Sequence, residues 1–490
     1  MIGKVSATAG EYPASPGQLW VRSIGLRLAV SAGGEVSGRR VAGGGGSVGS
    51  TEQKIEERLA QLQQKVGARH AEVLKHSNDD QFTVEYARLV NVWTLDRNVE
   101  WTRVFAHQPD TGAHTQQAHY VIKGVAGGDR HRYVNTHFSA DTWVELGVYR
   151  FTGTPQVQLT NTTADGTADE DVAWDAVAFQ PLAGKPKHIV VTMGDSYTSG
   201  EGAGAYSPES DRDHGESDWN ACRRSDNSWP RKVLLPGQST SIGELSDNRS
   251  ATVDFLDVSC SGAKTSQLTP GDSLPWGEIG NYHEVSQIDS GVLSPDTTMV
   301  MLTIGGNDAD NFTNAITNCY IIGICDPADY TGKVDQAVLD TEGLIADIAL
   351  TAPNAQIVLM GYPRLVSDKQ CVTADFNALN QLADYVRDKQ KAKVAELNKA
   401  GTKVAFADPI PAFQGHGICD GDEWINRVVA GPNGDGDFHA GDPANQAPCL
   451  PWPGENICAS LESFHPKNAG TTGYARVMEQ ELAGIGYKGS

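Results

Sequence analysis

The chain lacks long uncharged apolar runs and has few basic residues. No stretch of about 18 apolar residues without a charge occurs among its 490 residues, so the sequence predicts no membrane-spanning helix. Its 39 Lys and Arg stand against 61 Asp and Glu, which gives a formal net charge of −22. Such a chain has no basic stripe to contact phosphates, and the composition therefore argues against nucleic acid as a partner.

Cysteine is absent from the first 221 residues, and all eight cysteines lie between residues 222 and 458. They form no Cys-x-x-Cys pair and no Cys/His zinc spacing, so an even set confined to one region indicates disulfides rather than metal ligands. Because disulfides persist outside the reducing cytosol, we expect an exported domain in which neighbouring cysteines pair in order. No clean signal peptide accompanies it, since the run IGLRLAVSA is broken by Arg27 and starts late.

The first 77 residues lack the pattern of a folded domain. Residues 1–50 end in GGGGSVGS, a flexible composition, and we expect a disordered lead and linker there. In residues 51–77, apolar positions such as Ile55, Leu59 and Leu62 recur at three- and four-residue steps, which predicts an amphipathic helix. We expect this helix to dock on the neighbouring domain, with a short coiled coil as the alternative.

Residues 81–182 have the pattern of an all-β sandwich. Short alternating runs such as FTVEY and TWVELGVYRF are separated by turn-rich stretches such as AGGDR. Trp101, Tyr133, Trp143 and Trp174 could stack on sugar rings. Aromatic residues on alternating strands are more often core, and we favour the core by roughly three to one.

Residues 186–487 have the pattern of an α/β domain. Buried-strand runs without alternation are separated by helical stretches such as VDQAVLDTEGLIADIALTA, which predicts a flavodoxin-like, three-layer arrangement with a parallel sheet between helices. Functional sites in such sheets form at the carboxyl ends of the strands. The runs are HIVVTM (188–193), VDFLDV (253–258), TMVMLTI (298–304), AQIVLMG (355–361) and KVAFAD (403–408).

The first three of these strands end in small and polar residues that suit acyl transfer. GDSYTSGEG offers the hydroxyl of Ser196 as a nucleophile, and His465, in SLESFHPKNAG, is the candidate base that would take its proton. A tetrahedral intermediate also needs donors for its oxyanion, and the N–H groups of Ser196 and Gly262 and the side-chain amide of Asn307 can supply them. The sequence therefore predicts an ester hydrolase that needs neither cofactor nor metal.

Four blocks in order, GDSYTSGEG, CSGA, GGND and FHP, resemble the SGNH hydrolase superfamily, also called GDSL esterases and lipases, over about residues 186–487. The resemblance implies a secreted actinobacterial type of esterase or lipase with Ser196 as nucleophile, His465 as base and Ser196, Gly262 and Asn307 as oxyanion hole. Residues 100–182 resemble golvesin-type, carbohydrate-binding-module-like sandwiches. We expect a monomer whose substrate is a small-molecule or lipid ester, with polysaccharide as a further candidate partner.

The group that orients His465 has two candidates. The resemblance places an acid three residues before the histidine, where this chain has Glu462, whereas some relatives use a backbone carbonyl two residues before it, here that of Ser463. We favour Glu462 by roughly two to one, because a carboxylate fixes the tautomer and stabilises the imidazolium.

The resemblance also implies three disulfides, Cys222–Cys260, Cys319–Cys325 and Cys371–Cys419, to which Cys449–Cys458 would be an addition. The apolar loop CYIIGIC (319–325) would then be a stapled wall for an acyl chain, or local core packing, with nearly equal weight.

Carboxylates elsewhere invite other interpretations. The stretch NGDGDFHAGD (433–442) suggests calcium but lacks the glycine and glutamate of an EF-hand loop, so we expect no metal. Asp195 and Asp308 flank candidate site residues, and we expect them to hold loop backbone. Two rival functions remain: a polysaccharide O-acetyl esterase, and a carbohydrate-binding protein with an inactive hydrolase domain.

Overall fold

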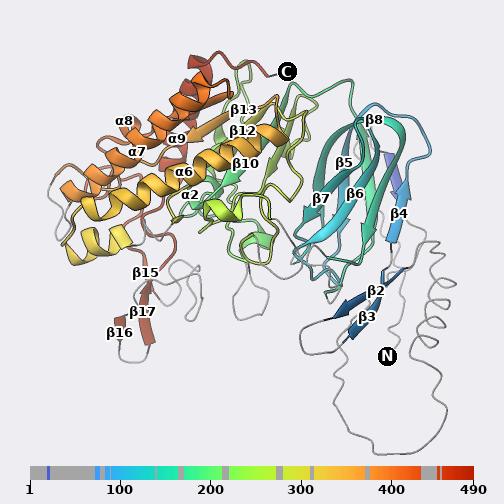
Figure 1. Ribbon diagram of the computed structural model, residues 1–490, viewed down its shortest axis with the longest axis horizontal. Coiled ribbons are helices and arrows are strands. Elements are labelled where there is room, and N and C mark those ends of the chain that lie inside the picture. Colours follow the sequence, from blue (N-terminus) through green and yellow to red (C-terminus); the bar gives the residue numbers. More distant parts are fainter. Residues whose placement is uncertain are drawn as a thin grey trace, which may run out of the picture. The chain divides into compact units, whose positions relative to one another are not determined.

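The chain forms two compact units, one up to Gly184 and the other from Lys185 (Figure 1). Within them, the computed structural model describes residues 19–22, 72–77, 83–88, 90–137, 141–163, 170–211, 220–271, 280–308, 314–369, 376–431, 450–452 and 455–489.

Antiparallel strands make up the first unit. The long strand β8 (Thr142–Thr160) pairs with β5 (Trp101–Gln108) along its first half and with β4 (Val90–Thr94) and β6 (Ala118–Val125) along its second half. One strand therefore belongs to two sheets, whose facing side chains enclose a hydrophobic core. Beyond β5 lies β9 (Ala176–Pro181), followed by β1 (Leu19–Arg22) at the edge, and β7 (Arg130–Val134) lies beyond β6.

The aromatic residues of this unit differ in burial. Trp174 is 5% exposed and belongs to the hydrophobic core, as the favoured interpretation required. Trp101, Tyr133 and Trp143 are only half-buried, so the favoured core position is not established for them and sugar binding stays the untested alternative.

Two expectations for the N-terminal 77 residues are wrong in part. The end of the predicted 51–77 helix is strand β2 (Glu72–Ser77), which pairs with β3 (Thr83–Arg88), whereas residues 51–71 lie outside the described part. Within the expected disordered lead, β1 pairs with β9. Both differences arise because a partner strand, which a local pattern does not reveal, supplies the backbone hydrogen bonds.

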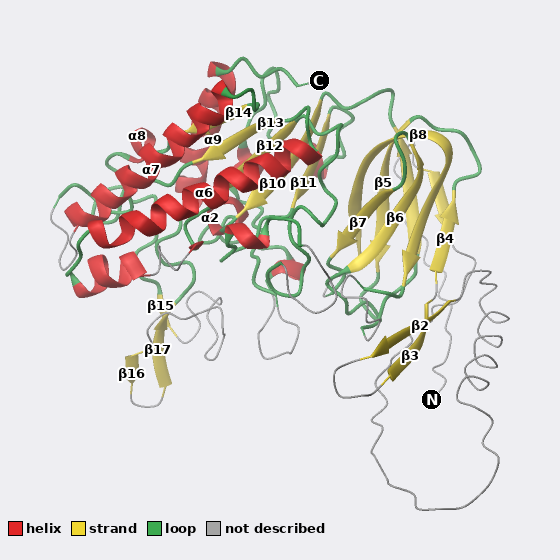
Figure 2. Ribbon diagram, viewed as in Figure 1, coloured by secondary structure: helices red, strands yellow, loops and turns green. Residues whose placement is uncertain are grey.

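A five-stranded parallel sheet forms the centre of the second unit, as predicted (Figure 2). Its strand order is β11-β10-β12-β13-β14, and each neighbouring pair is parallel. From β10 the chain first adds β11 on one side and then β12 on the other side, so the strand order reverses at β10. In α/β sheets a crevice forms at such a switch point, at the carboxyl ends of the strands. The strands are β10 (His188–Gly194), β11 (Val253–Asp257), β12 (Met299–Thr303), β13 (Gln356–Met360) and β14 (Val404–Ala407).

Helices cover both faces of this sheet. Alternate residues of β12 enter different apolar clusters: Met301 packs in a cluster with α3, α4 and α9, and Leu302 in one with parts of α6 and α7. Since both faces are apolar, the strands show no polar alternation, which explains their continuous hydrophobic runs. The helices are α3 (Trp229–Lys232), α4 (Ile242–Asp247), α6 (Ala328–Thr351), α7 (Phe376–Lys399), α8 (Ile410–Phe413) and α9 (Asn468–Gly484).

A small antiparallel sheet precedes the segment that carries His465. It consists of β15 (Ala430–Gly431), β16 (Leu450–Trp452) and β17 (Glu455–Ala459), in the order β15-β17-β16. The sequence analysis did not predict it.

Two of the expected disulfides are present, Cys222–Cys260 and Cys319–Cys325. Cys419 is also disulfide-bonded, but its expected partner Cys371 lies outside the described residues. The fourth expected pair cannot be checked either. Cys449 lies outside the described residues, and the side chain of Cys458 is likewise not described.

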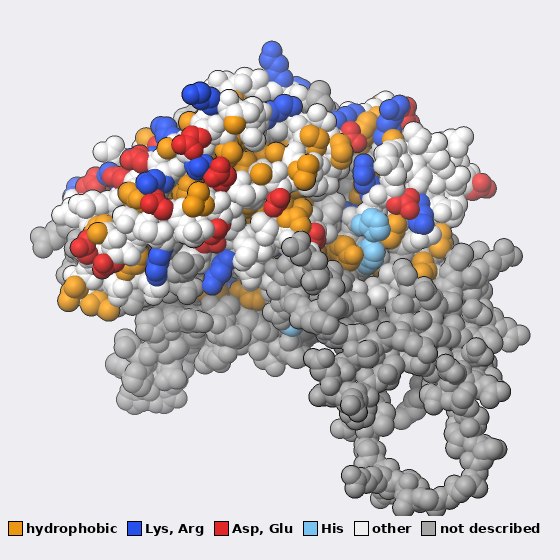
Figure 3. All heavy atoms as spheres, in the orientation of Figure 1, with side chains coloured by type: hydrophobic (Ala, Val, Ile, Leu, Met, Phe, Trp, Pro, Cys, Tyr) orange, Lys and Arg blue, Asp and Glu red, His pale blue; other side chains and the backbone are white. Residues whose placement is uncertain are grey.

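Charges of both signs are mixed over the face drawn in Figure 3. Ion pairs such as Lys389–Asp335 and Lys393–Glu342 join α6 and α7. None of the helices in the described residues is long and apolar enough to cross a membrane.

Candidate active site

Ser196 lies in a tight turn at the carboxyl end of β10. The strand ends at Gly194, whose φ is 116° and where a Cβ would lie 2.2 Å from the carbonyl oxygen of Thr303, so glycine is required. Asp195 caps the following short helix α2 (Ser196–Ser199) by accepting a hydrogen bond from the N–H of Tyr197. Ser196 is thus the first residue of a helix fixed at both ends, since Gly200 closes it in the left-handed conformation.

His465 is held by a loop that pairs with residues 424–426. Asn426 accepts from the N–H of Phe464 and donates to the carbonyl of His465, and an isolated bridge joins Ile425 to Pro466. The hydroxyl of Tyr197 donates to the carbonyl of Phe464 at 2.8 Å. The residue after Ser196 is therefore bonded to the residue before His465.

The structure brings the hydroxyl of Ser196 and the imidazole of His465 together. Oγ of Ser196 lies 2.7 Å from Nε2 of His465, although the two residues are 269 positions apart. Nδ1 of His465 lies 3.1 Å from the carbonyl oxygen of Ser463, which can only accept. Nδ1 therefore carries the proton, and the free lone pair of Nε2 faces the hydroxyl, as a general base requires.

The favoured orienting group, Glu462, is hydrogen-bonded elsewhere, and its role remains a prediction. Its Oε1 accepts from the hydroxyl of Tyr206 at 2.9 Å, and that hydroxyl accepts from the N–H of Gly202. The Ser463 carbonyl, the alternative, contacts the imidazole instead. The reason is the hydrogen bond from Tyr206, which holds the carboxylate near Gly202, in the part of the chain that follows Ser196.

Burial and charge act in opposite directions on the base. Burial lowers the pKa of His465 below its ordinary value, while the negative charge of Glu201 is the strongest influence that raises it. A lowered pKa keeps the imidazole neutral, which is the form that can accept a proton from Ser196.

Three strand-end segments, which carry Ser196, Gly262 and Asn307, are joined by backbone contacts. The N–H of Cys260 donates to the carbonyl of Gly194, and the side-chain amide of Asn307 donates to the carbonyl of Ala263 at 3.0 Å. The side-chain amide of Asn307 carries two N–H groups, and the hydrogen bond to Ala263 uses only one of them. Among the described residues, the N–H groups of Ser196 and Gly262 have no acceptor, so both are available to a ligand.

Buried side chains also join these segments. The Glu201 carboxylate, which is fully buried, accepts from the guanidinium of Arg223 at 3.1 Å and from the hydroxyl of Ser261 at 2.8 Å. Ser261 is the neighbour of Gly262, so this carboxylate links the nucleophile segment to the second strand-end segment. Glu201 was not predicted, because no local pattern marks a glutamate whose partners are distant in the chain.

The two aspartates that flank site residues hold loop backbone, in agreement with the sequence analysis. Asp308 accepts from the N–H and the hydroxyl of Thr265, and Asp195 accepts from the N–H of Tyr197 and, at 2.6 Å, from the hydroxyl of Thr303. Burial raises the pKa of Asp195 to about 6 and also raises that of Asp308.

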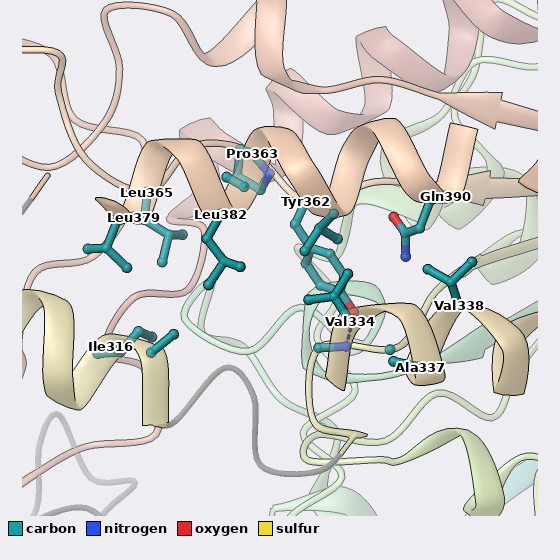
Figure 4. Close-up of a pocket in the computed structure, with 15 residues that line it drawn as sticks. Ile316, Val334, Ala337, Val338, Tyr362, Pro363, Leu365, Leu379, Leu382 and Gln390 are labelled. Atoms are coloured by element: carbon teal, nitrogen blue, oxygen red, sulfur yellow. Dashed lines mark hydrogen bonds between the residues drawn. The ribbon is translucent and has the colours of Figure 1, made fainter. Parts of the chain in front are cut away.

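An apolar cavity of about 80 Å³ lies beside the segment that leads to Asn307 (Figure 4). Gly305 and Gly306 form part of its wall, together with the ring of Tyr362. Side chains of α6, α7 and the start of η4 (Ile316–Ile322) supply the rest of the lining, and Figure 4 shows them directed toward one another from the two sides. They are Ala315, Ile316, Val334, Ala337, Val338, Leu379, Leu382, Ala383, Val386 and Gln390, with Pro363 and Leu365 from the loop after β13.

The stapled loop 319–325 contributes little to this cavity. Ile316, which precedes the loop, lines it, whereas Ile322 and Ile324 are 57% and 78% exposed. Tyr320 packs its ring against that of Phe464 at 5.0 Å. Their exposure argues against core packing for these two isoleucines, and the acyl-wall alternative remains a prediction.

In the part of the chain that the structure describes, no group of three or more His, Cys, Asp and Glu side chains could hold a metal ion. The NGDGDFHAGD stretch lies outside that part.

Comparisons with known proteins identify the family of the chain. Residues 190–472, more than half of the chain, match the family described as GDSL-like Lipase/Acylhydrolase. A lipase of Streptomyces rimosus is 30% identical over 251 residues, which cover 49% of this chain and 76% of that protein, and Lipase 1 of Streptomyces coelicolor is 28% identical over 262 residues, or 52% and 80%. The crystal structure of phospholipase A1 from Streptomyces albidoflavus NA297 aligns over 60% of this chain and 99% of that chain, with 27% identity and a TM-score of 0.38. The chain belongs to the GDSL-like lipase/acylhydrolase family and is a serine ester hydrolase.

Proposed function

We propose that the chain is an extracellular carboxylic-ester hydrolase in which Ser196 is the nucleophile and His465 the general base. The observation that carries the proposal is the 2.7 Å contact between Oγ of Ser196 and Nε2 of His465, with Nδ1 held by the Ser463 carbonyl. The disulfides Cys222–Cys260 and Cys319–Cys325 support an oxidising location outside the cytosol.

The proposed reaction proceeds through an acyl-enzyme. Oγ of Ser196 attacks the ester carbonyl carbon while its proton passes to Nε2 of His465, which gives a tetrahedral oxyanion. The N–H groups of Ser196 and Gly262 and the amide of Asn307 donate to that oxyanion. The C–O bond to the alcohol then breaks, and the alcohol leaves with the proton from His465. Water, deprotonated by the same imidazole, releases the carboxylic acid and restores the hydroxyl.

A fluorophosphonate probe tests this assignment directly. The serine oxygen attacks phosphorus and displaces fluoride, so we expect covalent labelling of the folded protein at Ser196, located by mass spectrometry of peptides. Labelling at another serine would contradict the choice of nucleophile. A folded protein without any labelling would instead support the carbohydrate-binding rival.

For the substrate, we propose esters of fatty acids. Gly305 and Gly306 line the apolar cavity, and Gly306 immediately precedes Asn307, which suits an acyl chain that extends from the carbonyl carbon. The rival polysaccharide O-acetyl esterase needs no such cavity.

Filling the cavity should therefore shorten the preferred acyl chain. Ala337 lines the cavity from α6 and is 6% exposed, and Ala337→Leu would occupy part of the space. We expect kcat/KM on nitrophenyl esters of eight or more carbons to fall by roughly tenfold, the cost of about 1.4 kcal/mol of lost apolar contact, with little change on the acetate. Wild-type protein that strongly prefers acetate, or equal losses at all chain lengths, would contradict the proposed fatty-acyl specificity.

A further inference from the structure

Tyr362 lies outside the four motif blocks yet contacts two of them. It follows β13 and is 7% exposed. Its hydroxyl accepts a hydrogen bond from the N–H of Gly306 at 3.0 Å and donates one to Oδ2 of Asp195. Gly306 immediately precedes Asn307, and Asp195 immediately precedes Ser196. One phenol therefore bridges the neighbours of the candidate nucleophile and of a candidate oxyanion donor.

The segment that Tyr362 contacts is intrinsically flexible. Between Ile304 and Asn307 the chain consists of Gly305 and Gly306, and Gly305 has a φ of 104°. Glycines leave the backbone many conformations, so two in succession do not by themselves fix where the amide of Asn307 points. The ring of Tyr362 packs directly on this link, since a Cβ at Gly306 would lie 3.1 Å from it.

Other hydrogen bonds also hold the Asn307 segment. The side-chain amide of Asn307 donates to the carbonyl of Ala263, and Asp308 accepts from Thr265, so both tie this segment to the Gly262 segment, which Glu201 joins to the Ser196 segment through Ser261. Thr303 bonds Asp195 but lies before the two glycines. Tyr362 adds a direct connection from Gly306, the residue before Asn307, to Asp195, the residue before Ser196.

We propose that Tyr362 is a positioning residue, which holds the Asn307 amide at the correct distance from Ser196 for the oxyanion to form. The proposal rests on the acyl-transfer function proposed above. Donors act on the transition state only when they already point at the place where charge develops, so a small displacement lowers the rate of the chemical step more than it weakens substrate binding.

The test is Tyr362→Phe, which removes one oxygen and keeps the ring that packs on Gly306. The matched control is Tyr330→Phe, because Tyr330 is a phenol buried in the same apolar cluster whose hydroxyl bonds Asn318 and Asn314, away from these segments. For Tyr362→Phe we expect kcat on a short nitrophenyl ester to fall about 10- to 100-fold, with KM nearly unchanged. The rate of fluorophosphonate labelling should fall by the same factor, because the phosphoryl oxygen occupies the same donors. Tyr330→Phe should retain both rates, and the melting temperatures of the two variants should be similar.

Three results would overturn the inference. The first is a Tyr362→Phe variant with wild-type kcat and labelling rate. The second is an equal loss in Tyr330→Phe, which would assign the effect to core packing. The third is a loss that disappears as the pH is raised, which would assign the effect to protonation of Asp195, since the hydrogen bond from Tyr362 is one of the influences that lower the pKa of that carboxyl. Failure to label wild-type protein at Ser196 would contradict the proposed function itself, and labelling of wild type separates the two cases.

Discussion

Ser196→Ala is expected to reduce ester hydrolysis by about 10⁶-fold, the loss that follows removal of a catalytic serine from a serine hydrolase. Without Oγ, no covalent acyl-enzyme can form, and only the oxyanion donors and substrate binding remain to accelerate attack by water. The fold should persist, because the substitution removes a single hydrogen bond, that to His465. Initial rates on a nitrophenyl ester, with circular dichroism of the same preparation, measure both quantities.

A suitable comparison is Ser207→Ala. The hydroxyl of Ser207 is also hydrogen-bonded, to Glu209 and Ser210, but it takes no part in the proposed reaction. This variant should retain wild-type activity. Residual turnover above a few per cent in folded Ser196→Ala protein would show that another group is the nucleophile.

His465→Ala should cause a loss of similar size, about 10⁶-fold, whereas Glu462→Gln should cost less than tenfold. The difference follows from the contacts of the two side chains. His465 is hydrogen-bonded to Oγ of Ser196, and its Nδ1 contacts the backbone carbonyl of Ser463, which Glu462→Gln leaves in place. The amide oxygen of glutamine can still accept from Tyr206, so the segment around Gly202 should keep its position.

The glutamine variant distinguishes the two candidates for the orienting group. Where a carboxylate orients the catalytic histidine, replacement by its amide costs about 10⁴-fold in kcat. A loss of that size in Glu462→Gln, without a loss of folded protein, would mean that the carboxylate turns to the imidazole during the reaction. A small loss would agree with the Ser463 carbonyl as the permanent partner.

The parallel sheet and the meeting of Ser196 with His465 could be predicted because their signals are local. A strand buried on both faces is a continuous apolar run, and a turn such as GDSYTSGEG is readable without knowing its neighbours. Parallel topology then brings all strand ends to one edge. The strands β1 and β2 were not predicted, because they are strands through their pairing with β9 and β3 and their own sequence pattern does not reveal these partners.

The contacts around the site were less predictable than the site itself. Glu462 was expected to reach His465, which lies three positions further along the chain. Its carboxylate instead accepts a hydrogen bond from Tyr206, which lies 256 residues earlier in the sequence. Tyr362 bonds Asp195 across 167 residues and carries no motif. A tyrosine among apolar residues is indistinguishable in sequence from an ordinary core residue.

The groups that can do the chemistry are recognisable in the sequence, because reactive side chains and the small residues beside them occur together along the chain. The neighbours that hold those groups in place became known only from the folded chain. Hydrogen-bond partners of buried side chains are chosen by distance in space after the strands and helices have packed, and sequence separation places almost no limit on that choice.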